Sequence, residues 1–236
     1  MNNSIDAVTF LSLGPGDPEL LTLQAVRILR EADVVMIPAT RSAEGKLVSR
    51  ASDIVSQWCD EDKIRRYVLP MQKNREAAQG VYDNIFHDAA DGYRQGLRVV
   101  VAVEGDVSIY ASIHYVLQQL ESDGIPVKQC PGIASFIAAA ASADLSLVSQ
   151  QQRLVVLPGD ADEATLQQLL QTNHVVVIMK LSQCQQVVKD FLCKNPDIVC
   201  HYFENVGTEG AFHTTVRDEI CSRPMPYFSL CILFPA

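Results

Sequence analysis

The sequence lacks any apolar run long enough to span a membrane, since no stretch approaches 18 uncharged apolar residues. Residues 1–6 also lack the basic start and apolar segment that are typical of a signal peptide. We therefore expect a soluble protein in the cytoplasm.

The paired spacing Cys-x-x-Cys is absent as well. The cysteines are odd in number and scattered, which argues against both a metal site and a disulfide framework. The seven are Cys59, Cys130, Cys184, Cys193, Cys200, Cys221 and Cys231. Those in apolar runs are expected to be small buried hydrophobic residues.

Positive charge is scarce, because 19 Lys and Arg face 28 Asp and Glu and leave a net charge of −9. This balance argues against nucleic acid as a partner, since phosphate contacts require a basic surface. The charge is uneven: residues 41–75 contain eight basic and five acidic side chains, a net charge of +3, so the remainder carries −12. A basic segment in an acidic chain suits an anionic substrate, although from the charge alone a solvated helix face with its loops is the favoured explanation.

No internal repeat, low-complexity linker or additional domain is evident. The 236 residues, of which 48% are hydrophobic and 20% charged, suffice for one large or two small globular domains.

The most informative segment is Leu11-Ser-Leu-Gly-Pro-Gly-Asp-Pro-Glu-Leu-Leu-Thr22. It follows an apolar run at 7–13 and precedes helical spacing at 19–29, so it is predicted to be a loop between a strand and a helix. Such loops bind ligands in open α/β sheets. Glu19 replaces the third glycine of a dinucleotide-binding motif, and the Gly-Lys-Ser/Thr ending of a P-loop is missing. A simple helix start, with Asp17 as the N-cap and Pro18 after it, is the alternative.

Strand and helix patterns alternate along the first half of the chain, which predicts parallel strands with helices on both faces. Expected strands are 33–37, 64–69 and 97–103, and expected helices are 47–58, 75–95 and 109–120. The second half predicts strands at 153–157, 175–179, 198–204, 212–215 and 228–234, with helices at 137–143, 163–171 and 182–195. No long crossover helix separates the last two strands, so part of the second sheet should be antiparallel. We place the domain boundary between residues 126 and 127, which gives two α/β domains, 1–126 and 127–236.

The second informative segment is Glu104-Gly-Asp-Val-Ser-Ile-Tyr110, at the carboxyl end of the expected strand 97–103. This end lies at the same sheet edge as the glycine-rich loop. Asp106 therefore presents a carboxylate either to a ligand or, as a plain N-cap, to the following helix.

Six segments together resemble the tetrapyrrole methylase family, which transfers methyl groups from S-adenosylmethionine. Besides the two above they are Pro131-Gly-Ile-Ala-Ser-Phe136, Val177-Ile-Met-Lys180, Glu204-Asn-Val-Gly-Thr208 and Tyr227-Phe-Ser-Leu230. Two positions depart from the family's pattern. Ser12 stands where the family usually has glycine, and Val107 stands where it usually has proline.

The resemblance implies two α/β domains, a parallel N-terminal sheet and a mixed C-terminal sheet, with the cofactor in the cleft between them. It implies S-adenosylmethionine as the cofactor, S-adenosylhomocysteine as the product, no metal, and a homodimer. Direct displacement at the methyl carbon needs close placement of the reactants, and Asp106 and Tyr110 are the candidates to assist the departure of a proton. The implied cofactor contacts are Pro15, Gly16, Gly105, Asp106, Ile109, Ala134, Ser135, Met179, Val206 and Phe228.

Within the family, the sequence is most similar to the precorrin-2 C20-methyltransferases of cobalamin synthesis, through Leu69-Pro-Met71, Ser108–Tyr110 and Pro131–Ala141. This implies methylation of C20 of precorrin-2 or cobalt-precorrin-2, an anionic tetrapyrrole. Basic side chains suit its carboxylates, and the candidates are Arg41, Lys46 and Arg50. The alternatives are a tetrapyrrole methylase with another target position, uroporphyrinogen III included, and a relative that binds S-adenosylmethionine without catalysis.

Overall fold

The computed structural model describes residues 6–41, 47–70 and 75–235. The chain divides into two compact units, Met1–Ala134 and Ser135–Ala236. The division falls after Ala134 rather than after residue 126, because the strand that follows residue 126 pairs within the first sheet. Each unit contains a sheet with helices, so the predicted pair of α/β domains is confirmed.

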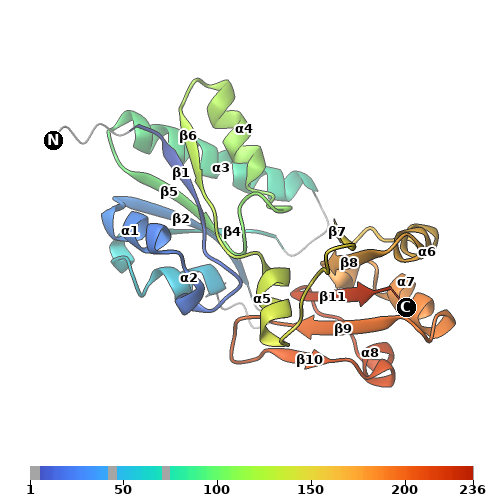
Figure 1. Ribbon diagram of the computed structural model, residues 1–236. Helices are drawn as coiled ribbons and strands as arrows, with labels where there is room; N and C mark the ends of the chain where they lie inside the picture. The colour runs from blue at the N-terminus through green and yellow to red at the C-terminus, as the bar shows by residue number, and fades with distance from the viewer. Residues whose placement is uncertain (1–5, 42–46, 71–74, 236) are drawn as a thin grey trace. The chain divides into compact units, whose positions relative to one another are not determined.

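The first unit is built on a six-stranded, largely parallel sheet (Figure 1). Its strands are β1 (Val8–Ser12), β2 (Val34–Arg41), β3 (Leu47–Val48), β4 (Ile64–Val68), β5 (Val99–Val103) and β6 (Val127–Cys130). The order is β3-β2-β5-β1-β6, and β4 pairs with β2. Only the β2–β3 pairing is antiparallel among those of the described residues of this sheet. Strand β1 lies between β5 and β6, and the three run in the same direction.

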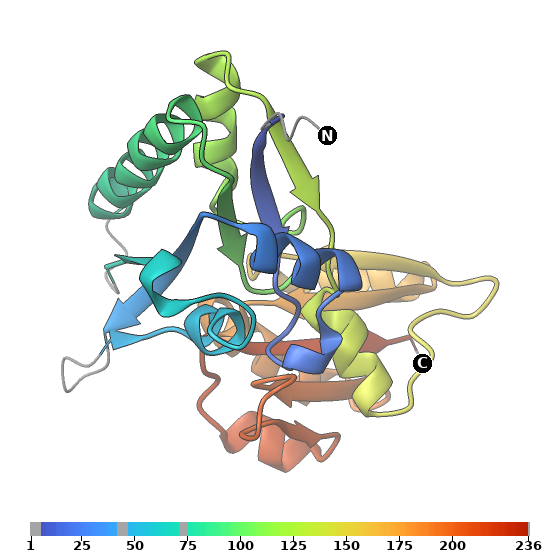
Figure 2. The ribbon, with the colours of Figure 1, turned by 90° about the vertical axis from the view of Figure 1, so that its left-hand side faces the viewer.

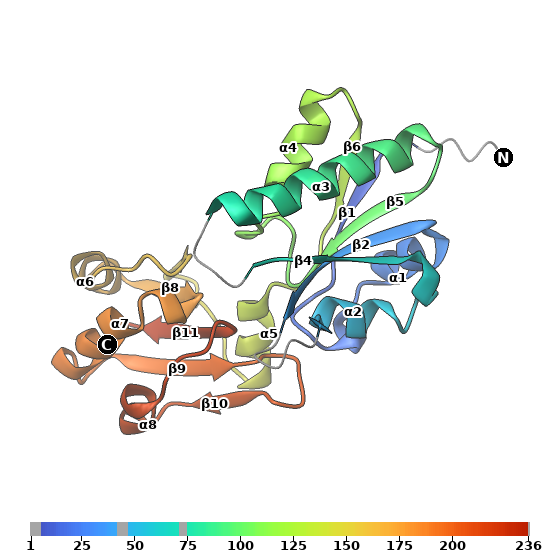
Figure 3. The same ribbon diagram turned by 180° about the vertical axis from the view of Figure 1, so that it is seen from behind.

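Helices cover both faces of this sheet, as Figures 1 and 3 show. They are α1 (Leu23–Glu31), α2 (Arg50–Val55), α3 (Arg75–Arg94) and α4 (His114–Ser122). Alternate residues of β5 point to opposite faces, so Val101 joins the core under α3 and α4 while Ala102 joins the core under α1 and α2. Burial on both faces explains why all five residues of β5 are apolar.

Two expectations for the segment after α1 were wrong. Strand β2 continues through Pro38 to Arg41 instead of ending at Ile37, and Pro38 pairs with Tyr67 of β4. Pairing with β5 stops at Met36, so the missing N–H of Pro38 leaves no bond to β5 unmade. The range 47–58 is not one helix either, because it begins with β3 and the α-helix is confined to Arg50–Val55.

Both predicted loop-to-helix junctions are longer than expected. Pro18–Leu20 forms a 3₁₀ turn that Asp17 caps through the N–H of Glu19, at 2.8 Å, and α1 starts only after its own cap, Thr22. Helix α4 begins at His114 and not at Ile109. Asp106 is therefore not its N-cap, since Ile113 holds that position.

The second unit contains a five-stranded mixed sheet with the order β10-β9-β11-β8-β7. Its strands are β7 (Arg153–Leu157), β8 (His174–Met179), β9 (Val199–Glu204), β10 (Phe212–Thr214) and β11 (Ser229–Phe234). Among the described strand pairs of this sheet, β7 and β8 are parallel and the others are antiparallel. The predicted antiparallel part of this sheet is thus confirmed.

The helices of this unit are α5 (Ser135–Ser142), α6 (Glu163–Gln171), α7 (Gln185–Lys194) and α8 (Arg217–Ser222), of which α8 was not predicted. Residues of α6, α7 and α8 form one core with alternate residues of β8, β9 and β11. Helix α5 crosses in front of the strands in Figure 2 and buries Phe136 and three alanines, Ala138, Ala139 and Ala140.

Candidate functional site

Three turns follow neighbouring strands at one edge of the first sheet. The first turn, Gly14–Asp17, follows β1, the second, Gly105–Ser108, follows β5, and the third, 131–134, follows β6. Because β5, β1 and β6 are adjacent and parallel, their carboxyl ends meet at the same edge. This is where open α/β sheets bind ligands.

The first two turns are joined through their backbones. The Gly14 N–H donates to the Gly105 carbonyl at 3.1 Å, and the Gly105 N–H donates back to the Gly14 carbonyl at 2.6 Å. Both residues have φ values, +72° and +75°, that favour glycine. An alanine Cβ at Gly105 would meet no atom within 4 Å, so this glycine borders open space in which a ligand has room.

Asp106 ties the second turn to the third. Its Oδ2 accepts the Gly132 N–H at 2.7 Å, and its Oδ1 accepts the Ser108 N–H at 2.8 Å and the Ser108 hydroxyl. Burial by itself would raise the pKa of Asp106, but these bonds and the Ser12 hydroxyl hold it below its ordinary value. The carboxylate is therefore ionised at neutral pH and both of its oxygens are engaged.

Ser12 joins the first strand to the other two turns. Its Oγ accepts the Val107 N–H at 2.9 Å, and Val107 is itself buried in the core under α3 and α4. A Cβ on Gly132 would lie 2.5 Å from the Ser12 Cβ and 3.3 Å from the Gly105 carbonyl oxygen, so only glycine fits at 132. Sequence reasoning quoted Gly132 within a motif but missed this requirement.

The other predicted residues of the first unit differ in exposure. Pro15 and Ala134 are buried, Gly16 and Ile109 are half-buried, and Tyr110 is 43% exposed. Tyr110 has a φ of +49°, which is uncommon for an aromatic residue and typical of functional turns. The structure thus places these residues on the three turns or directly after them.

Glu104 follows β5 and was not predicted as a site residue. Burial raises the pKa of its carboxyl group, while the charge of Arg50 and the N–H of Ala51 oppose the shift. Its carboxyl group therefore lies at the start of α2, beside one of the predicted substrate-binding residues. Lys46 and the side chain of Arg41 lie outside the described residues, as does Met71.

In the second unit, Met179 ends β8 and pairs with Leu230 of β11. The loop after β7 packs against it, because a Cβ on Gly159 would lie 3.0 Å from the Met179 carbonyl oxygen and 2.8 Å from that of Lys180. Burial lowers the pKa of Lys180. Sequence reasoning missed Gly159, although the Pro158-Gly159 pair marks a turn.

Val206 and Phe228 lie at the same end of this sheet. Asn205 donates its N–H to the Phe228 carbonyl at 2.9 Å, and Ser229 pairs with Glu204. Phe228 is 44% exposed, and Asn205 and Gly207 have positive φ values of 50° and 77°. With Met179 on the neighbouring β8, three of the four residues predicted in this unit share one sheet edge.

An ion pair between the buried Glu204 and the half-exposed Arg223 supports this edge. Glu204 is 7% exposed and accepts from Arg223 at 2.8 and 3.2 Å and from the Tyr202 hydroxyl at 2.7 Å. Arg223 lowers the pKa of Glu204 despite its burial. The fourth predicted residue, Ser135, is the first residue of α5.

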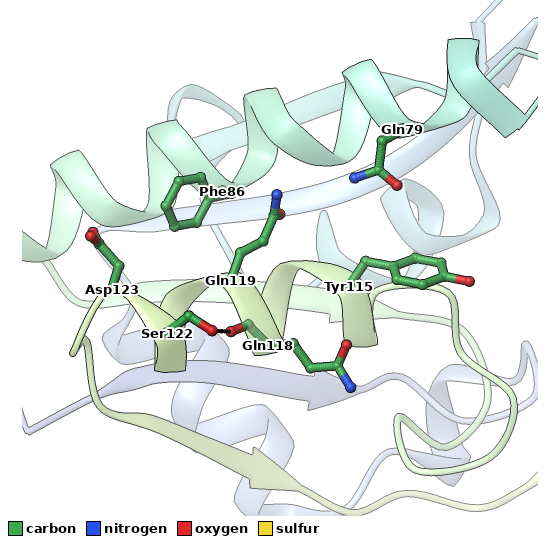
Figure 4. A pocket seen from close by; sticks show the side chains of 7 residues that line it. All are labelled: Gln79, Phe86, Tyr115, Gln118, Gln119, Ser122 and Asp123. Carbon is green, nitrogen blue, oxygen red and sulfur yellow. Dashed lines mark hydrogen bonds between the residues drawn. The ribbon is translucent and has the colours of Figure 1, made fainter.

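A separate open pocket of about 430 Å³ lies between α3 and α4 (Figure 4). Its lining residues are Gln79, Phe86, Tyr115, Gln118, Gln119, Ser122 and Asp123. None of them belongs to the predicted site.

Two further features concern the described ranges 6–41, 47–70 and 75–235 alone. No three His, Cys, Asp or Glu side chains gather there as metal ligands would. No helix in these ranges has both the length and the apolar character that a bilayer crossing demands.

Comparison with known proteins decides the family. The model for tetrapyrrole (corrin/porphyrin) methylases matches residues 7–220. The chain belongs to the tetrapyrrole methylase family. Its fold agrees with this, since a uroporphyrin-III C-methyl transferase from Thermus thermophilus, solved in complex with S-adenyl homocysteine, superposes with a TM-score of 0.69 at 20% identity. That likeness covers 97% of each chain.

Curated relatives of this methylase match it almost from end to end. The cobalt-precorrin-2 C(20)-methyltransferase of Salmonella typhimurium is 28% identical over 94% of each chain. The precorrin-2 C(20)-methyltransferase of a Sinorhizobium species is 30% identical over 93% of this chain and 91% of its own.

Proposed function

We propose that this methylase transfers the methyl group of S-adenosylmethionine to C20 of precorrin-2 or cobalt-precorrin-2 in cobalamin biosynthesis. The observation that supports this substrate is the match, over more than nine-tenths of the chain, to two relatives that are both named for C20 methylation of this tetrapyrrole. The family itself establishes a methyltransferase that uses S-adenosylmethionine.

The three turns of the first unit support the cofactor assignment. The open space beside Gly105 and the adjoining backbone groups fit the approach of a ligand. We propose that Pro15, Gly16, Gly105, Asp106, Ile109 and Ala134 contact the cofactor. In the second unit we propose Ser135, Met179, Val206 and Phe228. The shared cleft expected from the sequence stays a prediction.

When bound, S-adenosylmethionine supplies an electrophilic methyl group, which the substrate carbon takes as the bond from methyl to sulfur breaks. The residues of the chain then have to place the two reactants in line and exclude water. The contacts of Asp106 favour positioning over proton transfer, because its oxygens already bind Gly132 and Ser108 and its lowered pKa makes it a weak base. Tyr110 remains our candidate to assist the departing proton.

We propose that Arg50, with Arg41 and Lys46, binds carboxylates of the tetrapyrrole. Arg50 is half-buried at the start of α2 and lies near the carboxyl group of Glu104. Guanidinium groups bind carboxylates in a bidentate fork, which suits a substrate with many of them.

We also infer a homodimer in the cytoplasm, on the strength of the family resemblance. Light scattering coupled to size exclusion tests the dimer, and a mass equal to one chain of 26.0 kDa would contradict it.

Anaerobic incubation with methyl-labelled S-adenosylmethionine tests the reaction. Precorrin-2 and cobalt-precorrin-2 are supplied separately, and the product is analysed by mass and NMR. We expect one labelled methyl group at C20. A label at another carbon would indicate a methylase with another target, and cofactor binding without turnover on either substrate would indicate a protein that binds without catalysis.

Asp106→Asn tests the cofactor site. Asparagine keeps one acceptor but replaces the other with a donor, so we expect affinity for S-adenosylhomocysteine to fall by about tenfold, the usual effect of one impaired hydrogen bond to a charged group. Calorimetric titration measures this. Asp162→Asn is the control, because Asp162 caps α6 through Thr165 and asparagine caps a helix equally well. An unchanged affinity for Asp106→Asn would remove Asp106 from the site.

A further inference from the structure

Ser12 occupies an unusual position for a hydroxyl group. It is the last residue of β1, is 1% exposed, and pairs with Val103 of the apolar strand β5. A buried hydroxyl is costly unless it is hydrogen-bonded. Here its oxygen accepts the N–H of Val107, 95 positions away in the sequence, at 2.9 Å.

The Val107 N–H needs this acceptor. Val107 is 1% exposed, so water has little access to its backbone. Loss of the Ser12 hydroxyl would leave the N–H buried without a partner, and such a group destabilises whatever conformation holds it. The conformation at stake is the second turn, Gly105–Ser108.

Ser12 also constrains the third turn. Its Cβ fills the space where a side chain at residue 132 would lie, 2.5 Å away. Gly132 is the residue whose N–H binds Asp106, at 2.7 Å. A single side chain on β1 therefore contacts the elements on both sides of it.

The contact between Ser12 and Val107 can be removed from either side by a single exchange. A glycine at 12 would have no hydroxyl to accept a bond, and a proline at 107 would have no N–H to donate one. The hydroxyl of Ser12 and the N–H of Val107 bind each other. The two positions therefore form one matched pair.

We propose that Ser12 is a positioning residue for cofactor binding: its bond to Val107 and its contact with Gly132 fix the second and third turns in the conformation that receives S-adenosylmethionine. The inference rests on the proposed cofactor site. It adds that an exchange at 12 alone impairs the site, while an exchange at both 12 and 107 restores it in part.

A double-mutant cycle tests the pair. The variants are Ser12→Gly, Val107→Pro and the double variant, each titrated with S-adenosylhomocysteine by calorimetry and melted without ligand. We expect Ser12→Gly to weaken binding by about tenfold, as a buried unpaired N–H predicts. Val107→Pro should weaken it as well, since the Ser12 hydroxyl loses its donor. The double variant should recover part of the affinity that Ser12→Gly loses, because no buried N–H is then left at residue 107, although the bond of the Ser12 hydroxyl to Asp106 stays missing.

Ser52→Ala separates positioning from general stability. Ser52 is also a buried serine, and its hydroxyl accepts two bonds from Arg66 of β4, at 2.9 and 2.6 Å. This variant should melt at a lower temperature but keep its affinity for S-adenosylhomocysteine.

Each outcome has one meaning. If the unchanged protein does not bind S-adenosylhomocysteine, the proposed function fails, and this inference with it. If the unchanged protein binds but Ser12→Gly binds equally well, or the losses of the two single variants add in the double variant, the inference alone is overturned.

Discussion

Glu104 and Glu204 occupy comparable places in the two units, each where a strand gives way to a turn of the proposed site. Glu204 ends β9 and is held by Arg223 and Tyr202 at 2.7 to 3.2 Å. Glu104 follows β5 and faces the start of α2, where the N–H of Ala51 and the charge of Arg50 act on it. The pKa is lowered for Glu204 and raised for Glu104.

The difference between Glu104 and Glu204 shows two ways in which the conformation of a turn is stabilised. In the second unit an ion pair fixes the strand end, and the charged partner outweighs the cost of burial. In the first unit Ser12, Asp106 and the glycines interlock the turns, so that Glu104 takes no part in those bonds. Burial therefore opposes the ionisation of Glu104, and raised carboxyl pKa values of this kind are common at functional sites.

Gly159→Ala should produce the largest effect and tests how closely the second unit is packed at this edge. Its φ of +89° strains any side chain, and two backbone oxygens lie within 3.0 Å of the new Cβ. We expect a loss of about 3 kcal/mol in the free energy of unfolding, measured with urea. Gly80→Ala is the matched control, because it lies in α3 with nothing within 4 Å and should be neutral or slightly stabilising. Equal stability of the two variants would refute the close contact.

Glu204→Gln tests the ion pair. The exchange removes the charge that faces Arg223 but keeps the shape of the side chain. We therefore expect the free energy of unfolding, measured with urea at neutral pH, to fall by about 2 kcal/mol. Because the pKa of Glu204 is lowered on folding, its contribution is complete above the unfolded value near 4.5 and fades as the pH falls through the lowered folded value. The difference in the free energy of unfolding between the unchanged protein and Glu204→Gln should therefore shrink in acid. A difference that stays constant with pH would contradict the pairing.

Glu104→Gln should change the free energy of unfolding in the opposite direction from Glu204→Gln. The pKa of Glu104 is raised on folding, so its ionisation reduces stability as the pH rises from the unfolded value near 4.5 through the raised folded value. The amide oxygen of glutamine can still accept the N–H of Ala51. We therefore expect the free energy of unfolding to rise by about 1 kcal/mol at neutral pH and to stay unchanged in acid. A loss at neutral pH would show that the attraction between Glu104 and Arg50 outweighs the burial.

Asp33→Asn should have the smallest effect on the free energy of unfolding. The ion pair of Asp33 with Arg98 is the more exposed counterpart of the pair that Glu204 forms with Arg223. Hydrogen bonds from Arg98 hold the pKa of Asp33 at about 2, but both side chains are more than one-third exposed. Exposed pairs contribute below about 1 kcal/mol. That contribution should disappear as the pH falls from 3.8 toward 2 and should weaken with added salt. If the contribution of Asp33 does not weaken with added salt, it comes instead from the hydrogen bond that Asp33 accepts from the Arg98 backbone N–H, at 2.9 Å.

Local patterns in the sequence predicted most strands, because a strand buried on both faces is a short continuous apolar run. The valines of β5 and β8 are examples. Errors arose where such a pattern competes with turn chemistry. Leu47 and Val48 pair with Thr40 and Arg41 although their spacing also suits a helix. Residues 106–113 form turns, because the side chain of Asp106 binds the turn and does not cap a helix.

Only those parts of the site that consist of residues close together in the sequence could be predicted. Glycine loops and a strand-end aspartate are visible in the sequence, but the contact of Ser12 with Val107 joins positions 95 apart. No local pattern reveals which hydroxyl meets which N–H. The requirement for glycine at 132 likewise depends on a neighbouring strand and becomes visible only in three dimensions.

The backbone bridge between Gly14 and Gly105 has a consequence for the thermodynamics of ligand capture. The two turns bind each other in the protein without ligand, so their conformational entropy is lost when the chain folds and not when a small molecule arrives. Any nucleoside that settles on them meets a rigid, preorganised surface, and its affinity is undiminished by the ordering of these loops.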